Sequence, residues 1–201
     1  MLTFDELLGG QQIMVILRGQ APDRAVELAE AVWSAEAGIV EIPVQDETGF
    51  AALSAVAEAG RRGGRLVGAG TVLTVGQVGR ARAAGAAFTV APGFSAEVVA
   101  ASHEAGMPHL PGVGTATELQ RALSAGCTWV KAFPASALGL AWFREMHGPF
   151  PGVNFVATGG ITAETAADFL AAGARALGIG SAATRPGGLA AVLAALDAAP
   201  A

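Results

Sequence analysis

Glycines recur along this chain at an almost constant spacing, each at the end of an alanine-rich stretch. Successive members of the series lie 20 to 25 residues apart, and they are Gly38, Gly60, Gly85, Gly106, Gly126, Gly148 and Gly173. Glycine closes helices because it can adopt the left-handed conformation without steric penalty. A strand, a turn and a helix fill one such interval, so the series predicts a succession of strand–helix units.

Short apolar runs precede the helical stretches. We expect strands at residues 13–17, 39–44, 66–69, 87–91, 109–110, 128–133, 154–157 and 176–179. They are mostly apolar on both faces, which is typical of a parallel sheet covered by helices. The repeat predicts an α/β fold, a single (β/α)₈ TIM barrel domain over residues 1–201 with residues 1–12 as an N-terminal helical extension. A doubly wound sheet shares the alternation and is the alternative.

Composition restricts the partners and the compartment. With 52% hydrophobic and 14% charged residues, the chain has little charged surface to cover a monomer, which favours an oligomer. A formal net charge of -5 offers no basic face for nucleic acid. Cys127 is the single cysteine, so we expect a buried packing residue rather than a disulfide or a nucleophile. No secretory signal or membrane-length apolar run is recognisable, so we expect a soluble cytoplasmic protein without membrane contact.

Lys131 is the only lysine, and it stands inside the apolar run Thr128-Trp129-Val130-Lys131-Ala132-Phe133-Pro134. All other cations are arginines, whose guanidinium stays protonated, whereas a desolvated lysine becomes a nucleophile that can form a Schiff base. Chance retention under arginine-favouring codon usage would more readily leave a lysine on a solvated helix face. The position therefore favours a catalytic amine.

Glu41 places a carboxylate inside a second apolar strand. Burial raises the pKa of a carboxyl toward the range where it shuttles protons near neutral pH. A structural ion pair with Lys131 or Arg18 explains the same placement, and the spacing does not separate the two interpretations. Beside an imine-forming amine, this carboxylate would serve as the base that the chemistry requires.

The unusual residues follow the expected strands, at the end where barrel active sites lie. They are Arg18, Glu41, Thr71, Pro92, Lys131, Gly159, Gly160, Gly180 and Ser181. Glycines after the seventh and eighth strands expose backbone N–H groups, and such turns often hold a phosphate. A phosphorylated ligand is the expectation.

The histidines and tryptophans are expected to have structural roles. The histidines lack metal-ligand spacing and are expected at the surface or in loops: His103, His109 and His147. The tryptophans are expected in the core or at a subunit interface: Trp33, Trp129 and Trp142.

Six ordered motifs between about residues 13 and 181 resemble one known family. They are Val15-Ile16-Leu17-Arg18-Gly19, Val40-Glu41-Ile42-Pro43, Gly68-Ala69-Gly70-Thr71-Val72-Leu73, Thr115-Ala116-Thr117-Glu118, Val130-Lys131-Ala132-Phe133-Pro134-Ala135 and Thr158-Gly159-Gly160-Ile161. They are similar to the class I aldolases of 2-keto-3-deoxy-6-phospho sugar acids. That family includes the 2-keto-3-deoxy-6-phosphogluconate/4-hydroxy-2-oxoglutarate enzyme and the related phosphogalactonate enzyme.

The resemblance implies reversible cleavage to pyruvate and glyceraldehyde 3-phosphate, as in the Entner-Doudoroff pathway, without a metal or other cofactor and by a homotrimer. Lys131 would attack the C2 ketone and Glu41 would move protons. Arg18 and Thr71 match positions near the pyruvyl carboxylate, Pro92 lines that pocket, and Phe133 packs beside the imine. Gly159, Gly160, Gly180 and Ser181 match the phosphate-binding turns.

Departures from the family pattern bear on the substrate. Gln45 stands where phosphogluconate enzymes of the best-known bacterial type carry arginine, and Ile42-Pro43-Val44 is similar to the phosphogalactonate branch. Thr158 instead resembles the phosphogluconate branch, and its hydroxyl can discriminate the C4 epimers. We expect activity on both, with the gluconate epimer favoured. A 4-hydroxy-2-oxoglutarate aldolase, a phosphate-binding isomerase or synthase without an imine, and a silent binding protein are the alternatives.

Overall fold

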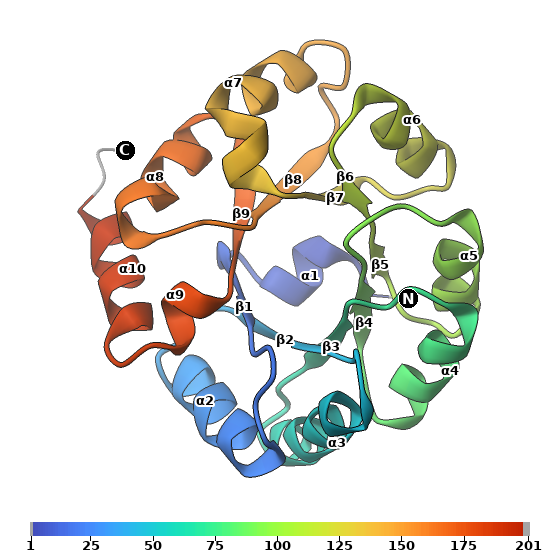
Figure 1. Ribbon diagram of the computed structural model, residues 1–201, viewed down its shortest axis with the longest axis vertical. Helices are drawn as coiled ribbons and strands as arrows, with labels where there is room; N and C mark the ends of the chain where they lie inside the picture. The colour runs from blue at the N-terminus through green and yellow to red at the C-terminus, as the bar shows by residue number, and fades with distance from the viewer. Residues whose placement is uncertain (1, 199–201) are drawn as a thin grey trace.

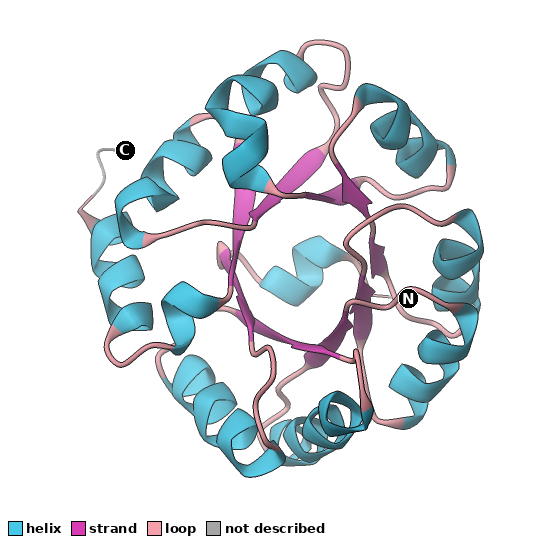
Figure 2. Ribbon diagram, viewed as in Figure 1, coloured by secondary structure: helices cyan, strands magenta, loops and turns pink. Residues whose placement is uncertain are grey.

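The computed structural model describes residues 2–198 and forms a TIM barrel (Figures 1 and 2). Nine strands, each parallel to its neighbours, run in the order β5-β4-β3-β2-β1-β9-β8-β7-β6. Their bounds are β1 (Ile13–Ile16), β2 (Ile39–Pro43), β3 (Val67–Gly70), β4 (Phe88–Val90), β5 (His109–Leu110), β6 (Gly112–Val113), β7 (Trp129–Ala132), β8 (Asn154–Thr158) and β9 (Ala174–Ile179). The predicted barrel is confirmed, and the doubly wound sheet is excluded because β1 pairs with β9.

The barrel closes through one interrupted strand. β5 pairs with β4 and β6 pairs with β7, while Pro111 separates β5 from β6. The carbonyl of Pro111 accepts a hydrogen bond from the Lys131 N–H at 2.8 Å, which continues the pairing across the interruption. The sequence predicted only the first half of this strand, because proline lacks a backbone donor and obscures a strand that continues past it.

Helices follow the strands in the order that the repeat predicts. They are α2 (Pro22–Ser34), α3 (Glu47–Arg62), α4 (Val75–Ala83), α5 (Ala96–Glu104), α6 (Ala116–Ser124), α7 (Ala135–His147), α8 (Ala163–Ala171), α9 (Ser181–Thr184) and α10 (Gly188–Asp197). They surround the strands (Figure 2). The apolar faces of both layers form the larger hydrophobic core. None of the helices within residues 2–198 is long and apolar enough to span a bilayer.

The interior of the barrel is a second apolar cluster, closed at one end by a short helix. Helix α1 (Phe4–Leu8) lies across the far mouth of the barrel in the view of Figure 1. Its Phe4, Leu7 and Leu8 pack with inward-facing residues of the strands, among them Phe88 and Trp129. The Trp129 Nε1–H donates to Asp5 Oδ2 at 3.1 Å, which ties the helix to β7. Water is therefore displaced from one end, and the opposite end is left for a site.

The glycine series marks helix ends at most of the predicted positions. Gly85, Gly106, Gly126 and Gly173 take positive φ values of 95°, 75°, 82° and 108° after α4, α5, α6 and α8. Gly148 also ends a helix, α7, but with a right-handed φ of -56°. The expectation was wrong at Gly60, which lies inside α3, where it allows Trp33 and the Arg65 carbonyl to approach its Cα. Close packing rather than a left-handed turn explains the glycine at position 60.

Two of the three histidines depart from the expectation of surface or loop positions. His109 is 3% exposed and lies in β5, and His147 is half-buried in α7, where its Nε2 forms a hydrogen bond with the Gly173 carbonyl at 2.8 Å. Hydrogen bonds join Thr89 Oγ1 to His109 Nδ1 at 2.8 Å and to Ser102 Oγ at 2.6 Å. Burial, with a smaller contribution from the neighbouring His103, lowers the pKa of His109 to about 3.

Cys127 and two of the three tryptophans lie where the sequence indicated. Cys127 is 4% exposed, and burial raises the pKa of its thiol to about 11, as expected for a packing residue. Trp33 and Trp129 are buried in the two clusters, and Trp142 is half-buried, with its Nε1–H donating to the Gly114 carbonyl at 3.1 Å. None of these side chains reaches the cavity described below.

We predict that His109 makes the fold sensitive to acid. Below pH 6.5 the unfolded chain binds a proton at this residue that the folded chain does not bind until about pH 3, so stability falls as pH falls through that range. The loss is about 1.4 kcal/mol per pH unit. Denaturant unfolding at pH 7.5, 6 and 5 should show wild type losing stability relative to His109→Asn. Parallel pH profiles of the two proteins would contradict the prediction.

Candidate active site

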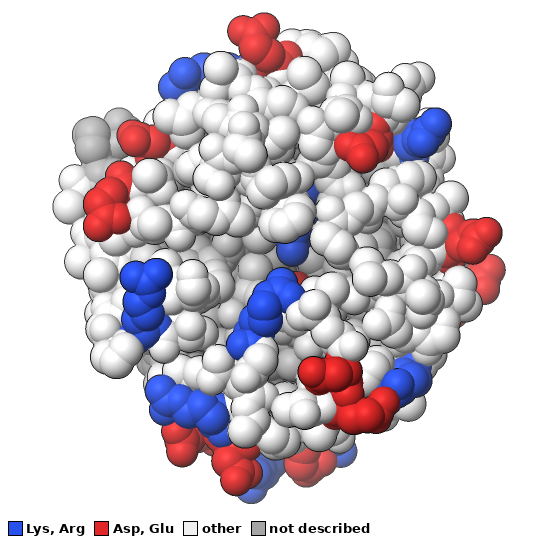
Figure 3. Space-filling view, viewed as in Figure 1, with Lys and Arg blue, Asp and Glu red and all other residues white. Residues whose placement is uncertain are grey.

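A cavity of about 680 Å³ opens at the carboxyl ends of the strands. All the predicted site residues except Glu41 line it: Arg18, Thr71, Pro92, Lys131, Phe133, Thr158, Gly159, Gly160, Gly180 and Ser181. In Figure 3 the same mouth is a central hollow with basic atoms in and beside it, while most other charged side chains lie around the edge of the molecule. The barrel thus brings together residues that are up to 163 positions apart in the chain.

Lys131 and Glu41 both project into the barrel interior. Lys131 is 3% exposed and Glu41 is 0% exposed, and each stands in a strand that is buried along its whole length. Burial lowers the pKa of Lys131, Glu41 raises it and Arg18 lowers it. Burial raises the pKa of Glu41, and Lys131 and Arg18 oppose that shift. Burial therefore favours the neutral form of both groups, and a neutral amine is the nucleophilic form.

The Glu41 carboxylate fits because β3 has no side chain at Gly70. A Cβ built on Gly70 would lie 1.9 Å from Glu41 Oε1 and 2.0 Å from its carboxyl carbon. Neither carboxylate oxygen accepts a hydrogen bond from any residue in the described range 2–198. A buried carboxylate without a donor is energetically costly and is retained where it has a proton to move or a charge to balance.

Arg18 and Gln45 meet at one side of the cavity. Arg18 follows β1 and Gln45 follows β2, and the Arg18 Nη1–H donates to Gln45 Oε1 at 2.5 Å. Both side chains are exposed at the mouth and line the cavity. Gln45 thereby orients the guanidinium of Arg18. This side of the cavity can bind one carboxylate.

Two threonines supply hydroxyl groups to the wall. Thr71 has a φ of 57°, an unfavourable left-handed conformation for a β-branched residue. Such strain is concentrated at functional sites. Thr158 is 3% exposed, and its hydroxyl donates only a long hydrogen bond of 3.4 Å to the Val156 carbonyl. Thr158 Oγ1 is therefore available to a ligand in the cavity.

The two glycine turns end β8 and β9 side by side. Gly159 and Gly160 have φ values of 97° and 76°, so a side chain would strain either position. A Cβ on Gly159 would lie 3.2 Å from the ring of Phe133, and the Lys131 Nζ lies 5.2 Å from the centroid of the same ring. The Phe133 ring therefore lies close to both the first glycine turn and the Lys131 amine, and its face is available to a cation formed on that amine.

Sequence reasoning missed several residues of the wall. Thr162 and Arg185 also line the cavity, and Ile16, Ile161, Gly178 and Ala182 complete the lining. The signal for Arg185 was the segment Arg185-Pro186-Gly187-Gly188 directly after the second glycine turn. Because all cationic residues of this chain except Lys131 are arginines, the residue type alone did not distinguish Arg185 from the other arginines.

One motif of the predicted set has a structural role. Thr115 caps α6, with its side chain accepting from the Glu118 N–H at 3.3 Å, and Glu118 Oε2 accepts from the N–H groups of Gly114 and Thr115. The hydrogen bond from Gly114 is the main reason that the pKa of Glu118 lies below its usual value. This capping box starts a helix and does not reach the cavity.

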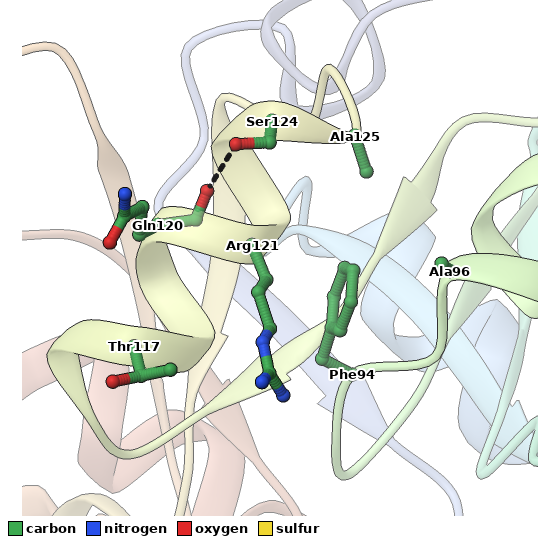
Figure 4. A pocket seen from close by; sticks show the side chains of 7 residues that line it. All are labelled: Phe94, Ala96, Thr117, Gln120, Arg121, Ser124 and Ala125. Carbon is green, nitrogen blue, oxygen red and sulfur yellow. Dashed lines mark hydrogen bonds between the residues drawn. The ribbon is translucent and has the colours of Figure 1, made fainter.

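A second hollow, of about 750 Å³, lies on the outer surface beside α6 (Figure 4). Phe94 and Arg121 extend alongside each other there, and the Ser124 hydroxyl donates to the Gln120 carbonyl at 2.9 Å. None of the predicted site residues lines this hollow, and all of its polar side chains stand on one helix. The cavity around Lys131 is the candidate active site because the buried Lys131 lines it together with the other predicted site residues, and Glu41 lies beneath it.

Comparison with known proteins identifies the relatives of this chain. The family model described as KDPG and KHG aldolase matches residues 4–190. A 2-dehydro-3-deoxy-phosphogluconate aldolase of Treponema pallidum is 37% identical over 172 residues, which cover 85% of this chain and 81% of that protein. A 2-dehydro-3-deoxy-6-phosphogalactonate aldolase of Escherichia coli K12 is 36% identical over 171 residues, covering 84% and 82%.

A solved structure extends the similarity to the fold. The KDPG aldolase of Legionella pneumophila, with pyruvate captured at low pH as a covalent carbinolamine intermediate, superposes with a TM-score of 0.85. It is 26% identical, and the match covers 99% of each chain. The whole barrel is therefore shared, including both ends of the strands.

We predict that Gly70→Ala destabilises the protein because the added methyl group would overlap the Glu41 carboxylate. Overpacking of this kind costs about 1–3 kcal/mol, or on the order of 5 °C in melting temperature for a chain of this size. Gly79→Ala is the matched control, since nothing lies within 4 Å of its Cβ position on the exposed face of α4. Calorimetry should find Gly79→Ala as stable as wild type or more stable. Equal melting temperatures for the two variants would disprove the packing argument.

Proposed function

The chain belongs to the KDPG and KHG aldolase family, and on that premise we propose that it cleaves 2-keto-3-deoxy-6-phosphogluconate, its C4 galactonate epimer or both to pyruvate and glyceraldehyde 3-phosphate. The observation that carries the proposal is the single lysine, buried beside Glu41 at the floor of a cavity with a cation at its rim. It is a class I, Schiff-base aldolase, a carbon–carbon lyase.

Binding of the keto acid begins at the Arg18 side. Arg18, held by Gln45, pairs with the carboxylate, and Thr71 and Pro92 line the same part of the wall. The C2 ketone then faces the Lys131 Nζ. The neutral amine attacks C2, and the carbinolamine loses its hydroxyl as water to give a protonated imine. Glu41 exchanges protons during this dehydration by way of a water molecule, since its carboxylate is too deeply buried to line the cavity.

Cleavage of the carbon–carbon bond follows from the charge on the imine. Removal of the proton from the C4 hydroxyl allows the C3–C4 electron pair to move toward the imine, which releases the aldehyde and leaves an enamine on Lys131. Glu41 acts as the base through the same water, and a proton added at C3 regenerates the pyruvyl imine. Water then hydrolyses the imine, releases pyruvate and restores the free amine. Phe133 packs beside the protonated imine, the cation that is present before cleavage and again before hydrolysis.

The phosphate end is formed by the two glycine turns. Gly159, Gly160, Gly180 and Ser181 line the cavity together, and their N–H groups and the serine hydroxyl are suitable donors to phosphate oxygens. The alternative substrate 4-hydroxy-2-oxoglutarate, which the family description includes, would use the pyruvyl half in the same way and has no phosphate for the glycine turns.

We propose in addition that the protein is a cytoplasmic homotrimer, as the family resemblance implies. The low share of charged residues and the exposed apolar side chains Leu73 and Val75, 56% and 49% accessible at the start of α4, support burial against other copies. The single buried cysteine is consistent with a reducing compartment.

The first test is trapping of the imine. Incubation with pyruvate and borohydride should add one reduced pyruvyl group per chain, and peptide mapping should place it on Lys131. Lys131→Arg keeps the charge and removes the nucleophile, so it should show no adduct and no cleavage. Without an adduct in the wild type, or with one only at the N-terminal amine, a phosphate-binding isomerase or synthase would replace the aldolase. Retained turnover in Lys131→Arg would have the same consequence.

A second test concerns the choice between the C4 epimers. We expect wild type to cleave both acids with the gluconate epimer favoured, because the Thr158 hydroxyl is free to bind the C4 hydroxyl. Thr158→Val keeps the shape of the side chain and removes the donor, so the ratio of kcat/KM values should shift toward the galactonate epimer by about 2- to 10-fold. Thr158→Ser retains the hydroxyl and serves as the control. An unchanged ratio in the valine variant would remove Thr158 from substrate discrimination.

A further inference from the structure

Arg185 is presented to the cavity by a tightly defined turn. The Gly188 N–H donates to the Arg185 carbonyl at 2.9 Å, with Pro186 and Gly187 between them. Gly187 has a φ of 71° and a ψ of -3°, and proline before such a residue defines a type II turn. A Cβ on Gly188 would lie 1.8 Å from the Ala182 carbonyl oxygen, so this turn also packs closely against α9. The backbone of Arg185 is therefore fixed before any ligand binds.

The guanidinium of Arg185 has no acidic partner in the described part of the chain. The ion pairs within residues 2–198 are formed by Arg24, Arg61 and Arg80. Of the described residues that line the cavity, none is an aspartate or a glutamate, so no anion of the protein neutralises this end. An exposed cation beside two glycine turns can bind an anion without first breaking an ion pair.

The cavity carries two arginines besides Lys131. Arg18 follows β1 and is engaged by Gln45, whereas Arg185 follows α9, directly after the turn that ends β9 at Gly180 and Ser181. A substrate with one anionic group satisfies only one of the two arginines. A keto acid with a phosphate at its other end satisfies both.

On the basis of the proposed function, we propose that Arg185 is a specificity-determining residue that makes cleavage depend on the phosphate of the aldehyde half. The guanidinium donates charge-assisted hydrogen bonds to the phosphate oxygens, while the glycine turns supply neutral N–H donors. Substrates without phosphate keep the Lys131 chemistry and lose this interaction.

The test separates phosphate binding from imine chemistry. Arg185→Ala, Arg185→Lys and Arg175→Ala are compared with wild type, since Arg175 is an exposed arginine at the opposite end of β9. Calorimetric titration with glycerol 3-phosphate, an unreactive phosphate ester, measures binding without turnover. Steady-state kinetics then compare 2-keto-3-deoxy-6-phosphogluconate with its dephosphorylated form, and borohydride trapping of pyruvate reports on Lys131.

Arg185→Ala should weaken glycerol 3-phosphate binding and lower kcat/KM for the phosphorylated acid by about 10- to 100-fold, the range of charge-assisted hydrogen bonds. Its turnover of the dephosphorylated acid and its pyruvate adduct should equal those of wild type, Arg185→Lys should be intermediate, and Arg175→Ala should match wild type. Equal losses on both substrates, or unchanged glycerol 3-phosphate affinity, would overturn the proposal. Should wild type form no pyruvate adduct, the aldolase function fails by itself and the titration alone decides the role of Arg185.

Discussion

The removal of water from Lys131 and Glu41 is the constraint on which the rest of this structure depends. An amine attacks a ketone only in its neutral form, and burial is what lowers the pKa of Lys131. The closed end of the barrel contributes to this burial, because α1 and the inward side chains around Phe88 displace water from below. The strands and outer helices seal the sides. A barrel with one closed end and one open end therefore provides both a dry floor and an entrance for substrate.

The charge distribution of the cavity follows from the same arrangement. Glu41 is the one acidic residue whose carboxylate opposes the pKa shift of Lys131, and it lies below the cavity wall. The rim carries two arginines, Arg18 after β1 and Arg185 after α9, one engaged by Gln45 and one without an ion pair in the described residues. An anionic substrate is thus attracted to the rim, while at the floor Lys131 and Glu41 each oppose the pKa shift that burial causes in the other.

Much of this site could be predicted from the sequence because its main residues are chemically unusual for their positions. A lysine and a glutamate inside apolar strands indicate inward-facing groups, and the repeat places them at one end of a barrel. Arg185 and the half-strand β6 could not be predicted in the same way. An arginine in a loop cannot be distinguished from an ordinary surface residue until the fold shows that it lines a cavity. β6 was missed because Pro111 has no N–H to donate, and the strand pairing there uses the Pro111 carbonyl as an acceptor instead.

Errors at His109 and Gly60 have a common physical origin. Both residue types are frequent at surfaces and in turns, and both are buried here because a tertiary neighbour requires it: Thr89 forms a hydrogen bond with His109, and the Trp33 ring and the Arg65 carbonyl lie against Gly60. The sequence around a residue does not show which distant residues will pack against it in the fold. The same limit applies to any glycine that serves as space for another side chain.

The glycines that face the barrel interior make pairs of positions interdependent. Gly68 leaves room for the ring of Phe88, and Gly178 for the Thr158 hydroxyl, as Gly70 does for Glu41. In each pair the two strands are neighbours, so the volume of one side chain sets the limit for the other. Evolution of this interior, or a mutant library directed at it, must therefore change such residues two at a time. Substitution at only one position of such a pair mainly gives sequences in which the two neighbouring strands no longer pack together.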